Sequence, residues 1–166
     1  MNREVDLVLA ALTPSNRLAL RVSLHTGLRI SDVLALRTAQ LAPRFWVTEV
    51  KTKKRRMVGL PAGLLHDLRM YAGETFVFEG RGNSQRHRTR QAVWADVKRA
   101  ARAFRLPQNA APHSFRKVYA VELMGKYGDI EKVRRCLNHG SATTTMIYAL
   151  ADAQLRAKFK KRRGRA

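Results

Sequence analysis

The sequence predicts a mainly helical α+β fold with a small three-stranded antiparallel sheet. The first observation behind this prediction is that apolar residues recur at helical spacing through most of the chain. The second is a change to alternating apolar and polar residues at 45–50, followed by another extended segment at 56–60. The third is a short apolar run at 75–78, the length of one strand. A chain of 166 residues is long enough for one domain with its own core.

The N-terminal part of the chain is expected to form three helices. Acidic residues near the start of 2–12 suit a helix N-terminus. Thr13 and Pro14 predict the start of a second helix, because proline is tolerated at the first helical position. Gly27 predicts its end, and a third helix is expected from about Ser31. The side chains expected to face the core are Leu18, Val22, Leu24, Ile30, Val33, Leu34 and Leu41.

A β-hairpin followed by a helix is expected next. Residues 45–50 would form one strand and 56–60 its antiparallel return, which leaves 51–55 as the turn. Pro61 predicts the start of the helix. Its inward side chains would be Leu64, Leu65, Leu68 and Tyr71.

A basic loop and four helices are expected in the second half. The glycine- and arginine-rich segment 79–90 should be the least structured part, and Thr89 or Arg90 should begin the first of these helices. The apolar stripe of that helix is Val93, Val97, Ala101 and Phe104. The other three helices are predicted at 114–127, at 130–137 with Asp129 as its cap, and at 142–150.

Basic residues dominate the composition. Thirty-three Lys and Arg against 12 Asp and Glu leave a formal net charge of +21, which implies a polyanionic partner. Ribosomal proteins share this balance, so charge alone fits them as well as an enzyme. No segment reaches the roughly 18 apolar residues of a membrane span, and no signal-peptide run follows Met1. The expected location is therefore the cytoplasm.

The acidic and metal-ligating residues favour chemistry without a metal or other cofactor. Magnesium is held by clustered carboxylates, whereas the acids here are scattered. Asp129 and Glu131 form a close pair, but they are better explained as acids at the start of a helix. Cys136 and the five histidines lack the tight spacing of zinc ligands, and Cys136 is expected at a buried helix position.

Side chains suited to a phosphodiester recur at separated positions. Arginine binds phosphate oxygens through a bidentate fork, histidine transfers protons near neutral pH, and tyrosine is an oxygen nucleophile. The motifs are Thr26-Gly27-Leu28-Arg29, the lysine-rich segment 51–56, His113-x-x-Arg116, His139 and Tyr148. In content, order and spacing they resemble the tyrosine recombinase (phage integrase) family, from about Leu7 to Leu155.

The resemblance implies a site-specific DNA recombinase or integrase that cuts and rejoins DNA through a covalent 3′-phosphotyrosine. Arg29 and Arg116 would hold the non-bridging oxygens of the scissile phosphate, with a third hydrogen bond from His139. His113 would be the general base and Tyr148 the nucleophile. The other tyrosines would be core or interface residues: Tyr71, Tyr119 and Tyr127.

The leaving 5′ oxygen needs a proton as it departs. Lys51 matches the family's hairpin lysine best, and Lys53 and Lys54 are close competitors. All three could instead contact backbone phosphates. The side chains expected to contact DNA are Lys53, Lys54, Arg86, Arg88, Arg90 and Lys98.

The resemblance also predicts organisation and partners. Residues 1–155 would be the catalytic domain and 156–166 a basic tail, without the N-terminal core-binding domain of most members. The partner would be double-stranded DNA and not a membrane, with a monomer in solution and a tetramer on DNA. An accessory DNA-bending protein is a further partner that this family allows.

Two alternatives remain open. A catalytically inactive relative would bind DNA as a regulator without cutting it. A type IB topoisomerase would use similar chemistry to relax supercoils without a defined site. A covalent protein–DNA adduct would exclude the first alternative, and relaxation without a defined site would favour the second.

Overall fold

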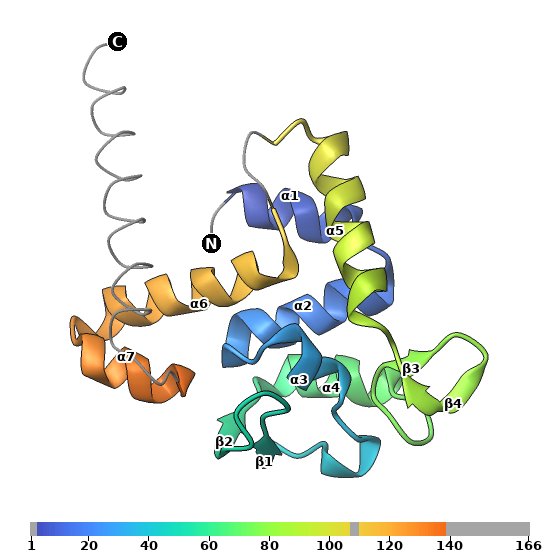
Figure 1. Cartoon of the computed structure of the whole chain (residues 1–166), viewed down its shortest axis with the longest axis horizontal. Coiled ribbons are helices and arrows are strands. Elements are labelled where there is room, and N and C mark those ends of the chain that lie inside the picture. The colour runs from blue at the N-terminus through green and yellow to red at the C-terminus, as the bar shows by residue number, and fades with distance from the viewer. Residues whose placement is uncertain (1–2, 107–109, 139–166) are drawn as a thin grey trace. The chain divides into compact units, whose positions relative to one another are not determined.

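The predicted fold class is confirmed by the computed structural model, which describes residues 3–106 and 110–138. Helices predominate, and the strands form small antiparallel sheets (Figure 1). The chain divides into two compact units after Arg116. No helix in the described ranges has the length and apolar character needed to cross a membrane.

The core of the first unit is built around α2. Helices α1 (Arg3–Ala11), α2 (Pro14–Thr26) and α3 (Ile30–Leu34) follow one another, and a short 3-10 helix, η1 (Thr38–Gln40), comes next. α2 contacts α1, α3 and α4 (Ala62–Tyr71), and Figure 1 shows it between α1 and α4. Its inward residues Leu18, Leu20 and Val22 are buried, each worth about 1.5–3 kcal/mol relative to exposure.

The predicted hairpin is confirmed. β1 (Arg44–Thr48) pairs antiparallel with β2 (Arg55–Gly59), with Phe45 opposite Val58 and Thr48 opposite Arg55. Phe45 and Val47 are buried on one face of β1, while Trp46 on the other face is half exposed. The strand therefore packs one side against the helices, as its alternating pattern predicted.

The prediction of a three-stranded sheet is wrong. The described residues form two sheets of two strands each, and the segment 75–78 contributes a single bridge from Phe76 to Arg37. The Val77 N–H donates to the Leu36 carbonyl, and the Phe78 carbonyl accepts from Arg88. The Thr38 N–H also donates to the Thr75 carbonyl, so the segment bonds to 36–38 and to the Arg88 backbone and not to β1 or β2.

The prediction that 79–90 is a loop and the least structured part of the chain is also wrong. β3 (Glu79–Gly80) and β4 (Asn83–His87) form a second antiparallel hairpin. Gly82 in its turn has φ 71°, a conformation that favours glycine. The hairpin brings the basic residues of this segment into a defined structure just before α5 (Arg90–Ala103).

α5 is capped and buried largely as predicted. The Thr89 hydroxyl accepts a hydrogen bond from the Ala92 N–H at 3.2 Å, and Val93, Val97 and Ala101 are buried. The prediction that Phe104 belongs to the apolar stripe of this helix is wrong, because Phe104 follows the last turn of α5 and is 40% exposed. Tyr71, at the end of α4, is similarly 42% exposed.

The second unit has a small core of its own. α6 (Pro112–Tyr127) runs across the division at Arg116, and α7 (Ile130–Leu137) follows it. The cluster consists of Ala120, Val133 and Leu137, with Tyr119, Leu123 and Met124 against it. Cys136 is only half buried, contrary to the prediction.

Asp129 caps α7 as predicted. Its carboxylate accepts hydrogen bonds from the N–H groups of Glu131 at 2.8 Å and Lys132 at 3.2 Å. The predicted helix at 142–150 and the basic tail at 156–166 lie outside the described residues.

A buried carboxylate joins the start of α2 to α5. Asp96 Oδ2 accepts hydrogen bonds from the Thr13 N–H, the Thr13 hydroxyl and Asn16 Nδ2 at 2.9, 2.9 and 2.7 Å. Asp96 Oδ1 accepts from Arg99 Nε at 3.0 Å. Burial by itself raises the pKa of Asp96, but these hydrogen bonds outweigh it and leave the pKa below its ordinary value.

Asp96→Asn should lower the free energy of unfolding by about 3 kcal/mol at pH 7, because an amide cannot accept from all of these donors. The folded-state pKa is depressed, so this stabilisation is complete above the unfolded pKa of about 3.9 and disappears as pH falls through the folded value. Urea unfolding at pH 7 and at acid pH measures both effects.

The exposed Arg21–Asp67 pair supplies the control for this measurement. Its atoms are 2.7 Å apart with both side chains more than a third exposed, so Asp67→Asn should cost less than about 1 kcal/mol. A similar loss in both variants would show that the Asp96 network does not carry the stability assigned to it.

Candidate active site

The site begins at the turn that follows α2. Gly27 ends this helix with φ 65°, a left-handed conformation that a side chain would strain. The Ser23 hydroxyl donates to the Leu28 carbonyl at 2.8 Å, and the Leu28 N–H donates to the Thr26 hydroxyl at 3.2 Å. These bonds hold the turn and place Arg29 at the cap of α3.

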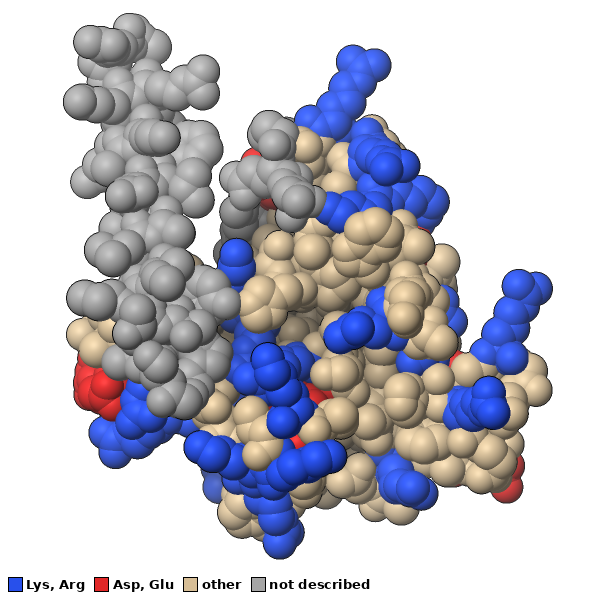
Figure 2. Space-filling model, in the orientation of Figure 1, with Lys and Arg blue, Asp and Glu red and all other residues tan. Residues whose placement is uncertain are grey.

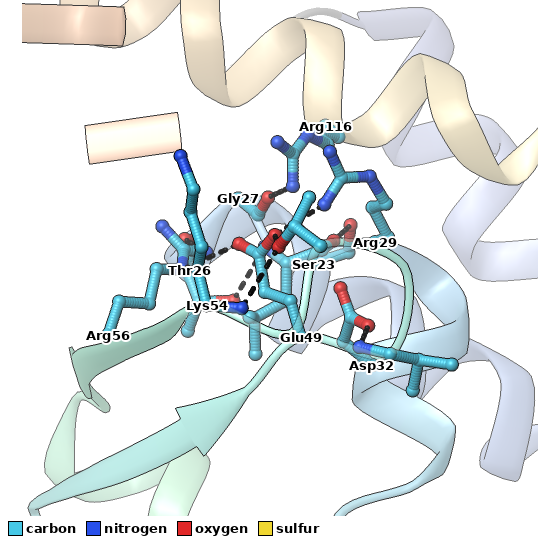
Figure 3. Close-up of polar contacts among 12 residues, drawn as sticks. Ser23, Thr26, Gly27, Arg29, Asp32, Glu49, Lys54, Arg56 and Arg116 are labelled. Carbon is cyan, nitrogen blue, oxygen red and sulfur yellow. Dashed lines mark hydrogen bonds and ion pairs between the residues drawn. The ribbon is translucent and has the colours of Figure 1, made fainter. Parts of the chain in front are cut away.

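Arg116 reaches this turn from the first part of α6. Its Nη1 donates to the Gly27 carbonyl at 2.6 Å, and its side chain is 1% exposed (Figure 3). Burial, followed by the nearby charges of Arg29 and Arg56, lowers the pKa of Arg116 to about 10. The guanidinium therefore remains charged at neutral pH, and the structure brings together the two predicted phosphate-binding arginines.

Glu49 lies directly after β1 and is fully buried at 0% exposure. Its Oε2 accepts hydrogen bonds from Arg29 Nη1 at 2.6 Å and from the Thr52 hydroxyl at 2.8 Å. Its Oε1 lies 3.5 Å from Arg56 Nε. Burial raises the pKa of Glu49, but the bonds from Thr52 and Arg29 outweigh this and leave it below its ordinary value.

Asp32 is a second buried acid beside the arginines. Its Oδ1 accepts a hydrogen bond from the Val50 N–H at 2.8 Å, which ties α3 to the hairpin turn. Its Oδ2 is buried without a hydrogen-bond partner among the described residues, and burial raises the pKa of Asp32 above its ordinary value. Two acids thus hold the turn of the β1–β2 hairpin against α3.

The hairpin turn carries the three candidate lysines. Lys51, Lys53 and Lys54 are all exposed, and Lys53 has a left-handed backbone with φ 57°. Figure 3 shows the Lys54 side chain extending from the hairpin past Glu49. The choice of Lys51 over its two competitors stays a prediction.

A groove within the first unit runs beside the arginines. It has a volume of about 460 Å³, and its walls include Arg29, Ser31, Arg90, Trp94, His113 and Arg116. His113 is exposed at the start of α6, on the same wall as Arg116. Of the six predicted catalytic residues, the structure thus places three along one groove. His139 and Tyr148 lie outside the described residues.

The predicted DNA contacts are spread over several elements. Lys53, Lys54, Arg86 and Arg90 are exposed, and Lys98 Nζ lies 5.5 Å from the centre of the Trp94 ring. Arg88 differs, because its Nε donates to Asn16 Oδ1 at 2.6 Å. This bond adds Arg88 to the Asp96 network, so part of its guanidinium has a structural role.

Positive charge gathers around the candidate site. Figure 2 shows Lys and Arg side chains crowded over the region of the β1–β2 hairpin, with little acidic surface between them. The hairpin alone supplies Lys51, Lys53, Lys54, Arg55 and Arg56. Such a surface would attract a polyanion, and the buried Arg116 with the half-buried Arg29 would bind one phosphate more tightly than exposed lysines would.

The main residue that the sequence prediction missed is Glu49. The alternating pattern at 45–50 puts it in phase with Phe45 and Val47, a signal from which its burial could have been inferred, but its partners could not be inferred from that pattern. Trp94 was also missed as a wall of the groove. No cluster of three or more His, Cys, Asp or Glu suited to a metal occurs among the described residues.

A family profile described as the phage integrase family matches residues 2–154. A tyrosine recombinase of Thermosipho africanus is 31% identical over 156 residues, covering 87% of this chain and 54% of that protein. A probable integrase/recombinase of Bacillus subtilis, YoeC, is 31% identical over 82% of this chain and 78% of its own length.

Solved structures with a similar fold include another integrase. The catalytic domain of bacteriophage HP1 integrase superimposes with a TM-score of 0.65 at 26% identity, covering 90% of this chain and 84% of that one. The chain spans about half the length of most of the curated relatives it matches.

Proposed function

This chain belongs to the phage integrase family, and on that premise we propose that it cuts and rejoins DNA at a specific site through a covalent phosphotyrosine. The observation that carries the proposal is the convergence of Arg29 and Arg116, far apart in sequence, beside one groove. The guanidinium groups of the buried Arg116 and the half-buried Arg29 are suited to the charge that develops on a phosphate under attack.

The proposed reaction gives each of the six predicted catalytic residues a role. The Tyr148 oxygen attacks phosphorus while His113 takes the phenol proton, and the bond from phosphorus to the 5′ oxygen breaks. The departing 5′ oxygen takes a proton from Lys51 and leaves as a hydroxyl. Arg29, Arg116 and His139 bind the non-bridging oxygens. The 3′-phosphotyrosine conserves the bond energy, so a 5′-hydroxyl can reverse the reaction and join a strand.

Double-stranded DNA is the proposed partner, held by phosphate contacts around the groove. The exposed lysines and arginines of the hairpin turn, Arg86, Arg90 and Lys98 would supply most of the affinity, with a smaller share from Arg88. Binding should therefore weaken steeply with salt, because each neutralised phosphate releases counterions. We also propose that the chain is monomeric in solution and assembles as a tetramer on DNA.

Incubating the protein with a nicked suicide substrate tests the proposal. Loss of a short fragment after cleavage prevents religation, so a covalent adduct should accumulate on a denaturing gel. The substrate should carry the DNA sequence that flanks the gene for this chain, with unrelated DNA as a control. Binding without an adduct at any salt concentration would instead identify a regulator, and adduct formation on every sequence would favour a topoisomerase.

A further inference from the structure

Glu49 stands out because a fully buried carboxylate lies within a strongly basic chain. Neither the proposed chemistry nor the family resemblance gives it a role. Burying a charge is costly unless it is paired and hydrogen-bonded. Its pairing with Arg29, Arg56 and Thr52 offsets that cost, and each of these partners belongs to or adjoins the candidate site.

The Glu49 backbone closes the hairpin turn as well. Its N–H donates to the Lys54 carbonyl at 3.0 Å, and its carbonyl accepts from the Lys53 N–H at 2.9 Å. Together with the Thr52 hydroxyl bond, these contacts fix the turn on both sides of Lys51. Glu49 therefore contacts the turn that holds Lys51, the proposed proton donor. Through Oε2 it also contacts Arg29, which would bind the phosphate.

The contact with Arg29 restricts the guanidinium. A carboxylate at 2.6 Å from Nη1 restricts the rotation of the group, and only 22% of the Arg29 side chain is exposed. Arg56 supports the same arrangement, because its Nη2 donates to the Thr26 carbonyl at 2.7 Å in the turn before Arg29 (Figure 3). A pre-oriented guanidinium needs no reorganisation when the phosphate gains charge.

We propose that Glu49 is a positioning residue that holds the Arg29 guanidinium and the Lys51-bearing turn in one fixed arrangement. This inference rests on the proposed function and adds a residue to it. Removing the carboxylate would then impair two steps at once, namely stabilisation of the charged phosphate and proton delivery to the 5′ oxygen. DNA affinity would change little, because it comes from many phosphate contacts.

Glu49→Gln keeps the size of the side chain and removes its charge. We expect the first-order rate of adduct formation at saturating suicide substrate to fall about 30-fold, with the DNA Kd within about threefold of wild type. Circular dichroism and thermal unfolding establish that the variant is folded at the assay temperature. Glu49→Asp, which retains a carboxylate, should recover part of the rate.

A substrate with sulfur in place of the bridging 5′ oxygen separates the two effects. A thiolate leaves without protonation, so this substrate does not need the lysine. If Glu49 positions the turn, sulfur should reduce the Glu49→Gln defect but not abolish it, because the orientation of Arg29 remains impaired. A structural role limited to folding would give equal defects with both substrates.

Glu131→Gln provides the matched control. Glu131 also pairs with an arginine, with its Oε2 2.7 Å from Arg134 Nε, but it is 47% exposed and lies in the second unit. The Glu131→Gln variant should cleave DNA at the wild-type rate. An unchanged rate in folded Glu49→Gln, or a faster one, would overturn the inference while the wild-type adduct still supported the proposed function.

A measurement without catalysis completes the test. The side-chain NMR signals of Arg29 in the DNA-free protein should show restricted rotation that is lost in Glu49→Gln and retained in Glu131→Gln. Unchanged Arg29 signals would overturn the inference even if the wild-type protein formed no adduct.

Discussion

Tyr148→Phe should abolish covalent linkage to DNA, lowering adduct formation by at least about 10⁴-fold. The substitution removes the one oxygen that is proposed to form the bond to phosphorus, and the remaining ring has no nucleophile. Binding should be retained, because a single neutral side chain contributes little to an affinity that depends on phosphate contacts. Denaturing gels with the suicide substrate measure linkage, and native gels on the same DNA measure binding.

Tyr127→Phe is the control for this experiment. The Tyr127 ring lies beneath the ammonium groups of Lys126 and Lys132, at 5.3 and 4.3 Å from its centre, and phenylalanine preserves a ring there. This variant should form the adduct at the wild-type rate. An adduct that persists in Tyr148→Phe would mean that the nucleophile has been assigned to the wrong residue.

Arg116→Lys should slow adduct formation by about 10³-fold while the protein remains folded. Lysine keeps the nominal charge but is one atom shorter and lacks the planar fork, so it cannot bond to the Gly27 carbonyl and two phosphate oxygens together. The burial that lowers the pKa of Arg116 to about 10 would also lower that of a lysine, whose ordinary pKa is about 10.4. Single-turnover cleavage at saturating DNA measures the loss.

Arg21→Lys makes the same chemical change at another arginine that pairs with an acid. Arg21 contacts Asp67 at 2.7 Å and its side chain is 38% exposed. The Arg21→Lys variant should therefore cleave DNA at the wild-type rate. If Arg116→Lys cleaved as fast as Arg21→Lys, the buried guanidinium would have no special part in the reaction. Thermal unfolding of both variants separates a loss of chemistry from a loss of structure.

The boundaries of α2, α5 and α7 could be predicted because local signals decide them. Pro14 begins α2 and Gly27 ends it in a left-handed conformation, while Thr89 and Asp129 cap α5 and α7 through their side chains. Each signal acts on backbone groups within a few residues. The sequence contains both partners of such an interaction in one short stretch.

Strand partners could not be predicted in the same way. The run 75–78 has the length and composition of a strand, but the Phe78 carbonyl bonds to Arg88 and the Val77 N–H to Leu36. The glycine- and arginine-rich segment after it forms the β3–β4 hairpin, although its composition predicted a loop. A backbone hydrogen bond in a sheet depends on which distant segment lies alongside, and composition does not specify that.

The candidate site combines both kinds of information. The motifs predicted Arg29, His113 and Arg116, and all three line one groove. Their catalytic roles stay predictions, as do those of Lys51, His139 and Tyr148. The pattern at 45–50 puts Glu49 in phase with the buried Phe45 and Val47, but it could not supply the partners that offset the burial of this acid.

By itself, the sequence determined the α-helices among the described residues, the basic character and the set of residues able to act on a phosphodiester. Only the tertiary structure decided that Arg116 bonds to the turn before Arg29, and that Glu49 holds Arg29 and the hairpin turn together. The physical reason is that chemical capability belongs to each side chain, whereas orientation and charge compensation arise between residues that only folding brings into contact.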